Sequence, residues 1–399
     1  MSEVANIPQL RFSEFSGEWE EKKLGELCKF TQGVQIPFSE QLTKYKEGAI
    51  RYLYIRDFFT DDFPYYVKDQ YPNKVIHTDE IMMVNTGNTA GKAFMGATGV
   101  LSNNAFKVSF DKTKVSNIFL FQRITSDTIQ RRIKSFFNAG GQPHLGHKNI
   151  AIIPMGFASL KEQQKIAAFL TTVDSKIEQL SKKQELLGEY KKGLMQKIFS
   201  QAIRFKADDG SEFPDWEEKK LGDLIAEISD GGTPPTSNKG NFGGGINWVV
   251  IDDIRDEIRI TKETLTETGL SNSSSKLWKP ETIILSTGAT IGRVGIAKIY
   301  TTTKQGVCGI VVNQFTSNLF LKYWFIFNIN LLKRFSQGSS IKEVRPPTLI
   351  KFDISTPSLP EQTKIANFLS SIDSKIEQVG KQLDESKQFK KALLQQMFV

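Results

Sequence analysis

Two long stretches of the chain repeat hydrophobic residues with a spacing of seven. In residues 159–200 one row of apolar side chains recurs every seven positions, and a second row falls four positions later. The same pattern returns in residues 358–399. An average spacing of 3.5 residues is typical of a heptad repeat, so both stretches are predicted to be long helices. A narrow apolar stripe favours a single partner helix, and the simplest partner is the other copy.

The residues expected to pair the helices are the members of these rows. In the first helix they are Ile166, Leu170, Val173, Ile177, Leu180, Leu187 and Leu194. In the second they are Ile365, Leu369, Ile372, Ile376, Val379, Leu383 and Leu393. Polar residues interrupt the rows at Gln184, Lys191, Ser386 and Lys390. The alternative is that each helix is only the last amphipathic helix of a domain, but stripes of about five heptads favour a coiled coil.

The two helices are copies of one sequence, and the repeat extends beyond them. Glu162–Leu180 and Glu361–Val379 agree at 13 of 19 positions, with an offset of 361 − 162 = 199 residues. Before them, Trp19-Glu-Glu-Lys-Lys-Leu-Gly matches Trp216-Glu-Glu-Lys-Lys-Leu-Gly. A repeat of this length predicts the order globular unit, helix, globular unit, helix. The predicted boundaries are 1–158, 159–200, 201–357 and 358–399.

Each globular unit is predicted to mix strands and helices. Apolar runs at residues 81–84 and 282–285 are strand candidates that lead into matching Thr-Gly turns at 85–92 and 286–293. Val307–Val312 is another strand candidate, and residues 116–137 and 317–335 are predicted to be helical. Ile55-Arg-Asp-Phe also resembles Ile251-Asp-Asp-Ile. In contrast, residues 31–50 and 229–247 are unlike each other, as expected of loops with different tasks.

Composition narrows the class of protein only modestly. The chain has 399 residues, with 39% hydrophobic and 24% charged residues, which is ordinary for a globular protein. No secretory signal or membrane-spanning run is visible, and the two cysteines cannot make a disulfide framework, so a reducing cytoplasm fits best. The net charge of +8 allows a polyanionic partner without requiring one.

The motifs that suggest catalysis are all incomplete. Residues 87–92, GNTAGK, have one residue too few between the glycines for a phosphate-binding loop and lack the following Ser or Thr. His144 and His147 lie in a Gly-rich stretch without further ligands at useful spacing, so no metal site is predicted. Asp215, Glu217 and Lys219 contain the letters of a metal-dependent nuclease signature, but they stand too close together for its usual arrangement.

The duplicated features together resemble the specificity (S) subunit of type I restriction-modification systems. The resemblance covers nearly the whole chain, and order, spacing and duplication all agree. It is carried by the matching segments that begin at Trp19 and Trp216, the Thr-Gly turns, the helix starts Leu160-Lys-Glu-Gln and Leu359-Pro-Glu-Gln, and the loop Gly231-Gly-Thr-Pro234. The resemblance implies an α+β fold in which two target recognition domains are separated by two long antiparallel coiled-coil helices with an internal pseudo-twofold repeat.

The same resemblance implies the function and the partners. Each globular domain would read one half of a bipartite double-stranded DNA target. The helices would set the gap and dock two methylation (M) subunits, which restriction (R) subunits then join. The chain itself would be non-catalytic, with S-adenosylmethionine, ATP and Mg used by the partner subunits. A helix of about 40 residues is about 60 Å long, which limits the gap to roughly 17 base pairs. Thr31–Pro37 lacks the Gly-Gly-Thr-Pro sequence of the second unit, so the two half-sites are expected to differ.

Candidate DNA-binding residues are polar or basic residues in predicted loops, because Arg, Lys, Asn and Gln make most base contacts. In the first unit they are Gln35, Arg56, Lys92, Gln142, His144 and Lys148. In the second they are Lys239, Asn241, Arg293, Lys342 and Arg345. Two other functions stay open, a coiled-coil adaptor that binds protein without DNA specificity and a nuclease that uses Asp215, Glu217 and Lys219.

Overall fold

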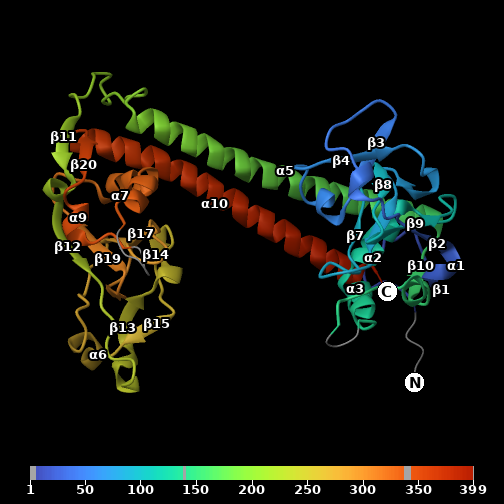
Figure 1. The fold of residues 1–399 in the computed structure, drawn as a ribbon. Coiled ribbons are helices and arrows are strands. Elements are labelled where there is room, and N and C mark those ends of the chain that lie inside the picture. Colours follow the sequence, from blue (N-terminus) through green and yellow to red (C-terminus); the bar gives the residue numbers. More distant parts are fainter. Residues whose placement is uncertain (1–5, 138–140, 337–342, 399) are drawn as a thin grey trace. The chain divides into compact units, whose positions relative to one another are not determined.

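The computed structural model describes residues 6–137, 141–336 and 343–398 and divides into two compact units (Figure 1). Unit 1 is Met1–Lys182 with Gly380–Val399, and unit 2 is Lys183–Val379. Each unit holds one globular domain with mixed strands and helices, together with parts of the two long helices α5 (Leu160–Phe199) and α10 (Leu359–Gln396). The predicted α+β class with two long helices is confirmed.

Ten short strands form three sheets in the described part of unit 1. They are β1 Glu20–Lys23, β2 Cys28–Gln32, β3 Ala49–Leu53, β4 Tyr65–Lys68, β5 Val75–Ile76, β6 Ile81–Val84, β7 Ala93–Phe94, β8 Gly99–Leu101, β9 Ala105–Phe110 and β10 Pro154–Phe157. The central sheet has the order β2-β9-β6-β7 and is antiparallel. A second sheet has the order β4-β3-β8-β5, and β1 pairs with β10. The predicted strand 81–84 is β6.

Unit 2 repeats this arrangement with small differences. Its strands are β11 Glu217–Lys220, β12 Ile225–Asp230, β13 Phe242–Val249, β14 Glu257–Ile258, β15 Glu263–Leu265, β16 Ile283–Ser286, β17 Val294–Ala297, β18 Thr301–Thr303, β19 Val307–Val312 and β20 Asp353–Thr356. The central sheet runs β12-β19-β16-β17-β14, the second sheet β15-β13-β18, and β11 pairs with β20. The predicted strands 282–285 and 307–312 correspond to β16 and β19.

Short helices connect the strands. Those of unit 1 are α1 Leu24–Leu27, α2 Asn117–Thr125, α3 Asp127–Lys134 and α4 His147–Ala151, with 3₁₀ helices η1 Phe38–Glu40, η2 Ile55–Phe58 and η3 Pro72–Lys74. Those of unit 2 are α6 Glu267–Ser271, α7 Asn318–Phe327, α8 Ile329–Arg334 and α9 Pro346–Leu349, with η4 Leu221–Leu224, η5 Lys239–Asn241 and η6 Ile251–Asp253.

Each of the two shorter predicted helices is divided in two. In unit 1 the break is at Ser126, whose hydroxyl donates to the Arg123 carbonyl oxygen at 2.7 Å. In unit 2 it is at Asn328, whose side-chain amide donates to the Trp324 carbonyl oxygen at 3.0 Å. Ser and Asn side chains that bond to a nearby carbonyl compete with the helical ladder, so a continuous apolar pattern does not reveal these breaks.

The start of α5 is buried in the core of unit 1, together with the end of α10. Ile166 and Leu170 belong to the same apolar cluster as Leu393, Met397 and Phe398. Further along, Lys390 of α10 pairs with Asp174 of α5, with 2.6 Å between Lys390 Nζ and Asp174 Oδ1. Later residues of α5 therefore contact earlier residues of α10, which means that the two helices are antiparallel in this unit.

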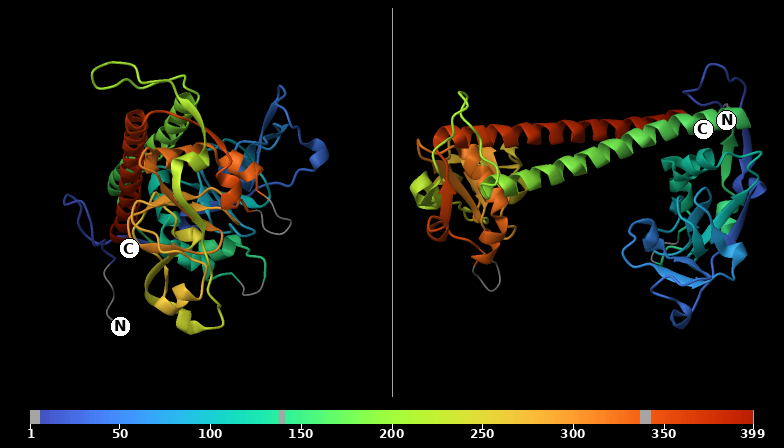
Figure 2. Two further views of the ribbon diagram at one scale, coloured as in Figure 1. Left: turned by 90° about the vertical axis from the view of Figure 1, so that its left-hand side faces the viewer. Right: turned by 90° about the horizontal axis from the view of Figure 1, so that it is seen from above.

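Unit 2 shows the same packing with the helices exchanged. Ile365 and Leu369 of α10 share a cluster with Met195 and Ile198 of α5. Both long helices are continuous, α5 in green and α10 in red (Figure 2). The expected pairing residues are all buried or half-buried. The first members of each row nevertheless pack in a domain core as well as against the other long helix. The prediction of a single partner helix therefore describes one part of the packing. The alternative, in which each helix is the last helix of a domain, describes the other part.

Candidate nucleic-acid interface

The Thr-Gly turn of unit 1 follows β6 at one end of the central sheet. The loop before α4 is pinned to it, because the Gly87 N–H donates to the Pro143 carbonyl oxygen at 2.9 Å and the Leu145 N–H donates to the Asn85 carbonyl oxygen at 2.7 Å. Gly91 has a φ of +84°, and a Cβ there would lie 2.5 Å from Ile133 Cγ2. The turn therefore requires glycine for backbone geometry and for close packing against α3.

Unit 2 builds the same turn after β16. The Val344 N–H donates to the Thr287 carbonyl oxygen at 2.9 Å, which pins the segment before α9 to the turn. Gly292 has a φ of +96°, and a Cβ there would lie 2.5 Å from Ile329 Cγ1 of α8. The agreement between Gly91 and Gly292 explains why the sequence repeat is strong at this turn.

The segments after β2 and β12 follow the same path although their sequences differ. A Cβ on Gly33 would lie 2.0 Å from the Ser102 carbonyl oxygen, and a Cβ on Gly231 would lie 2.2 Å from the Lys304 carbonyl oxygen. One glycine in each segment therefore allows the chain to cross close to the backbone of the turn before β9 or β19. Side chains beyond this crossing are free to differ without changing the scaffold.

The sequence-predicted residues of unit 1 lie on four segments around this end of the sheet. Gln142 and His144 are exposed on the loop pinned to the Thr-Gly turn, and the His144 Nδ1 is 3.2 Å from Thr86 Oγ1. Lys92 is exposed on the turn itself, and Lys148 is exposed on α4. Gln35, beyond the Gly33 crossing, accepts a hydrogen bond from Asn103 Nδ2 at 3.2 Å.

Arg56 lies on η2 and is held by aromatic rings. Its guanidinium carbon is 5.2 Å from the ring centroids of both Tyr54 and Tyr65. Phe58 and Phe59, at the end of η2, pack at 5.2 and 5.1 Å from the ring of Phe94, which is two residues after Lys92. These contacts connect η2 to the end of the Thr-Gly turn.

In unit 2 the predicted residues have more varied surroundings. Arg293 is exposed on the turn, where it contacts η6. Arg345 is exposed, and its Nε lies 3.5 Å from Glu343 Oε2. Lys239 is exposed on η5, whereas Lys342 lies outside the described residues.

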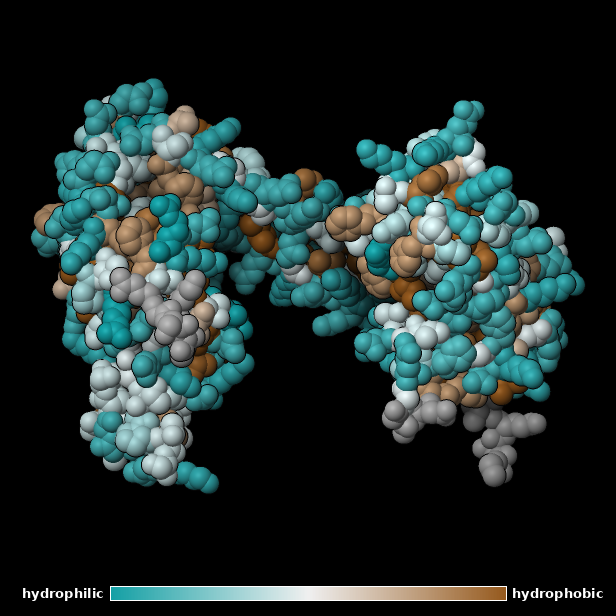
Figure 3. Space-filling model, viewed as in Figure 1, coloured by the Kyte–Doolittle hydropathy of each residue, from teal (hydrophilic) through white to brown (hydrophobic). Residues whose placement is uncertain are grey.

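Asn241 is fully buried. Its Nδ2 donates to the Pro235 carbonyl oxygen at 2.9 Å, and its Oδ1 accepts from Asn272 Nδ2 at 3.0 Å. These contacts hold the lobe of β13, β15 and α6 together, and they leave the Asn241 side chain unavailable to a base edge in this structure. Figure 3 shows this lobe mostly in pale colours, because small and weakly polar residues dominate 231–247.

Two titratable groups near these turns have shifted pKa values. Burial raises the pKa of Asp230, at the end of β12, and the neighbouring carboxylate of Glu343 raises it further. Burial lowers the pKa of His147, and the nearby His144 adds to this effect. His147 packs on the core residue Phe106, with 4.8 Å between ring centroids.

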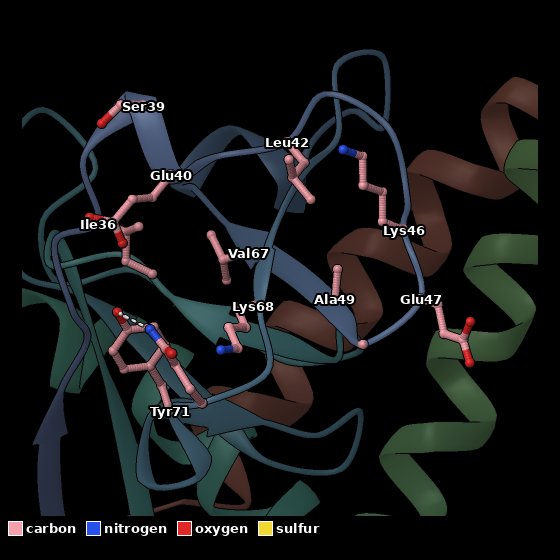
Figure 4. A pocket seen from close by; sticks show the side chains of 12 residues that line it. Ile36, Ser39, Glu40, Leu42, Lys46, Glu47, Ala49, Val67, Lys68 and Tyr71 are labelled. Atoms are coloured by element: carbon pink, nitrogen blue, oxygen red, sulfur yellow. Dashed lines mark hydrogen bonds between the residues drawn. The ribbon is translucent and has the colours of Figure 1, made fainter.

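One hollow of unit 1 was considered as a site for a reaction. A hollow of about 670 Å³ in unit 1 lies against β3, β4 and η1 (Figure 4). Its charged residues are two acids and two bases, Glu40, Glu47, Lys46 and Lys68. Among residues 6–137, 141–336 and 343–398, no group of three or more His, Cys, Asp or Glu side chains could hold a metal ion. None of the helices in these ranges is long and apolar enough to cross a bilayer.

The three residues of the nuclease hypothesis lie on an exposed surface. Glu217 and Lys219 of β11 pair with each other at 2.8 Å, and this hydrogen bond lowers the pKa of Glu217. Asp215 is fully exposed beside Arg204.

The sequence-based selection missed the residues that orient the two arginines. Tyr54 and Tyr65 hold Arg56, and Asp252 holds Arg293. The match between Ile55-Arg-Asp-Phe and Ile251-Asp-Asp-Ile was a usable signal for Asp252, because it aligns an Arg with an Asp in an otherwise shared motif. Tyr65 had no such signal, since it comes from a different strand.

Comparison with known proteins places these features in a family. The sequence model described as the type I restriction modification DNA specificity domain matches residues 16–187 and again residues 214–386. The chain is 26% identical over 400 residues to the type I restriction enzyme MjaVIII specificity subunit of Methanocaldococcus jannaschii, covering 94% of this chain and 91% of that protein. It is 36% identical over 191 residues to the MjaIX specificity subunit of the same organism, covering 46% and 44%.

The fold is also found in solved structures. The S subunit of a type I restriction-modification system from M. genitalium superposes with a TM-score of 0.62 at 14% identity, covering 98% of this chain and 99% of that one. The chain therefore belongs to the family of type I restriction-modification DNA specificity subunits. Members of this family are the non-catalytic, specificity-determining component of the restriction enzyme.

Proposed function

We propose that each globular domain reads one half of a bipartite, asymmetric double-stranded DNA target. The observation that carries this proposal is a duplicated scaffold with unlike side chains at equivalent positions. The Thr-Gly turns and glycine crossings are shared, whereas Arg56 corresponds to Asp252 and Lys92 to Arg293. Two similar domains with different surface chemistry suit two different half-sites.

The test is methylome sequencing of cells that carry this chain with its methylation partner, compared with cells in which this gene is deleted. A split, asymmetric motif that disappears on deletion is the expected result, and it would give both half-sites and the gap. Unchanged methylation in a strain with an active methylation subunit would contradict the proposal. The protein-binding adaptor would then be preferred, and DNA binding that ignores sequence would support it.

We further propose that the chain docks two methylation subunits in the cytoplasm and that S-adenosylmethionine, ATP and Mg act in those partners and in the restriction subunits. The internal repeat supports two equivalent docking surfaces. A solved structure that describes complex assembly and conformational transition of the type I R-M system contains a chain of similar fold, with a TM-score of 0.57 at 17% identity. The purified chain with S-adenosylmethionine should not methylate DNA until the methylation subunit is added. Methylation by the chain alone would contradict this assignment.

We also propose that α5 and α10 set the length of the unread gap. Inserting one heptad into each helix preserves the apolar seam and adds about 10.5 Å, or about 3 base pairs. The methylated motif should keep both half-sites and gain a longer gap. A variant that assembles and methylates with the original gap would refute the role of the helices as a ruler.

A further inference from the structure

A 3₁₀ helix lies beside the Thr-Gly turn in both units. An aspartate caps each one in the same way, because Asp57 Oδ2 accepts from the Tyr54 N–H at 2.7 Å and Asp253 Oδ2 accepts from the Val250 N–H at 3.1 Å. The residue before this aspartate is Arg56 in η2 and Asp252 in η6. These two residues therefore occupy equivalent positions with opposite charge.

In unit 1 the guanidinium of Arg56 is restrained yet accessible. It lies 5.2 Å from the ring centroids of Tyr54 and Tyr65, and its Nη2 donates to the Phe63 carbonyl oxygen at 3.4 Å. The Arg56 side chain is still 48% exposed. Contacts with two aromatic faces limit the directions in which the guanidinium can point while leaving donors open to solvent.

In unit 2 an arginine reaches the equivalent place from the neighbouring turn. Arg293 Nη1 donates to Asp252 Oδ1 at 3.0 Å and to the Ile251 carbonyl oxygen at 3.1 Å. Its side chain is 42% exposed. The acid at position 252 therefore does for Arg293 what the two tyrosines do for Arg56. Each unit thus presents an oriented guanidinium beside its Thr-Gly turn, and the two arginines come from different elements.

We propose that Arg56 and Arg293 each read a guanine, one in each half-site, and that Asp252 is a positioning residue for Arg293. The planar guanidinium matches the O6 and N7 acceptors of guanine in the major groove with two donors in a fixed geometry, whereas a lysine ammonium is a point charge on a flexible stem. Restraint before binding reduces the entropy lost when the contact forms. This inference rests on the proposed function and adds the base and the residues that recognise it.

The test uses the complex of this chain with its methylation subunits, and it measures binding to the native site and to sites with each base pair changed. Arg56→Lys and Arg293→Lys keep the positive charge but lose the planar set of guanidinium N–H donors. Each should reduce discrimination at a single G·C pair, in its own half-site, by roughly 5- to 150-fold. Arg131→Lys on exposed α3 and Arg259→Lys, which pairs with Glu257, are matched controls and should leave discrimination unchanged.

Asp252→Asn tests whether Asp252 positions Arg293 or contacts a base itself. It should relax the same base pair as Arg293→Lys, and the double variant should be no worse than the Arg293→Lys single variant, whereas Glu257→Gln should have no effect. Relaxation at a different base pair would show that Asp252 contacts a base itself and would overturn its assigned role.

The outcomes also separate this inference from the proposed function. If both lysine variants discriminated like the wild-type complex, or lost affinity equally for all sequences, the arginines would be phosphate contacts and the inference alone would fail. A wild-type complex without any sequence preference would instead overturn the proposed function, and this inference with it.

Discussion

The buried carboxylate at the start of α10 provides a sharp test of what holds unit 2 together. The Glu361 side chain is 0% exposed. Arg204 donates to it twice, from Nε at 2.9 Å and Nη2 at 3.0 Å, and the Trp216 indole N–H donates at 3.3 Å. The pairing with Glu361 raises the pKa of Arg204. The cluster therefore connects the segment before β11 to the first turn of α10.

Replacing Arg204 with Met leaves the Glu361 charge buried with one weak donor. Loss of one partner from a buried ion pair costs about 3–5 kcal/mol. For a unit of this size 1 kcal/mol shifts the Tm by about 2–4 °C, so the Tm should fall by about 6–20 °C. Replacing both Arg204 and Glu361 with Met should recover most of this loss, because no unpaired charge remains.

Thermal unfolding of the full chain, followed by tryptophan fluorescence, is a suitable assay. Four of the five tryptophans, at positions 216, 248, 278 and 324, lie in unit 2. The matched control is Lys206→Met, since the Lys206–Glu212 pair in the same unit is exposed and should contribute at most about 1 kcal/mol. The reasoning is refuted if Arg204→Met is no more costly than this control, or if the double variant is as unstable as the single one.

Three further predictions follow from other contacts. Lys191→Met should lower the unfolding free energy of unit 2 by about 1–2 kcal/mol in urea titrations, because it removes the 2.5 Å ion pair with Asp373; no change would contradict this. Phe398→Ala should destabilise unit 1 by about 3–5 kcal/mol, measured by circular dichroism, because its ring is buried in that core; an effect confined to unit 2 would contradict this. The raised pKa of Asp230 beside Glu343 means that the folded state binds its proton more tightly. Stability should therefore decrease as pH rises through that pKa, and Asp230→Asn should lose this dependence; an unchanged pH profile would exclude it.

The parts of the fold that the sequence predicted are those encoded by local patterns. The seven-residue spacing predicted helices at 159–200 and 358–399, and the structure has them at Leu160–Phe199 and Leu359–Gln396. The Thr-Gly turns were visible because glycine is required at fixed positions in both copies. The family assignment rested on the same duplicated anchors and is confirmed.

Contacts between distant segments could not be predicted in this way. Lys191 interrupts the apolar row of its helix, and only the structure shows that Asp373 neutralises it. Arg11 pairs with Glu162 as Arg204 pairs with Glu361, but the spacing between the arginine and the following tryptophan differs by four residues in the two copies. Alignment on the tryptophans therefore hides the matching arginines.

The candidate interface shows the same division between scaffold and variable surface. Gly33 and Gly231 match although the segments around them do not, because each glycine must pass close to a neighbouring backbone. Asn241 was selected as an exposed polar loop residue, yet it is buried by hydrogen bonds within its own lobe. Residue type in a loop does not distinguish a side chain that supports the loop from one that faces outward.

The ends of the two long helices pack in the domain cores, and this explains why the helix sequences are repeated while the loops differ. Leu393 at the end of α10 and Met397 and Phe398 just after it are part of the core of unit 1, and the corresponding end of α5, with Leu194 and Ile198, packs in the core of unit 2. Each domain thus completes its core with the helix that follows the other domain in sequence. The apolar residues at these ends must be kept in both copies, whereas the segments beyond the glycine crossings carry no such constraint. Substitutions can therefore occur in those segments without loss of either core.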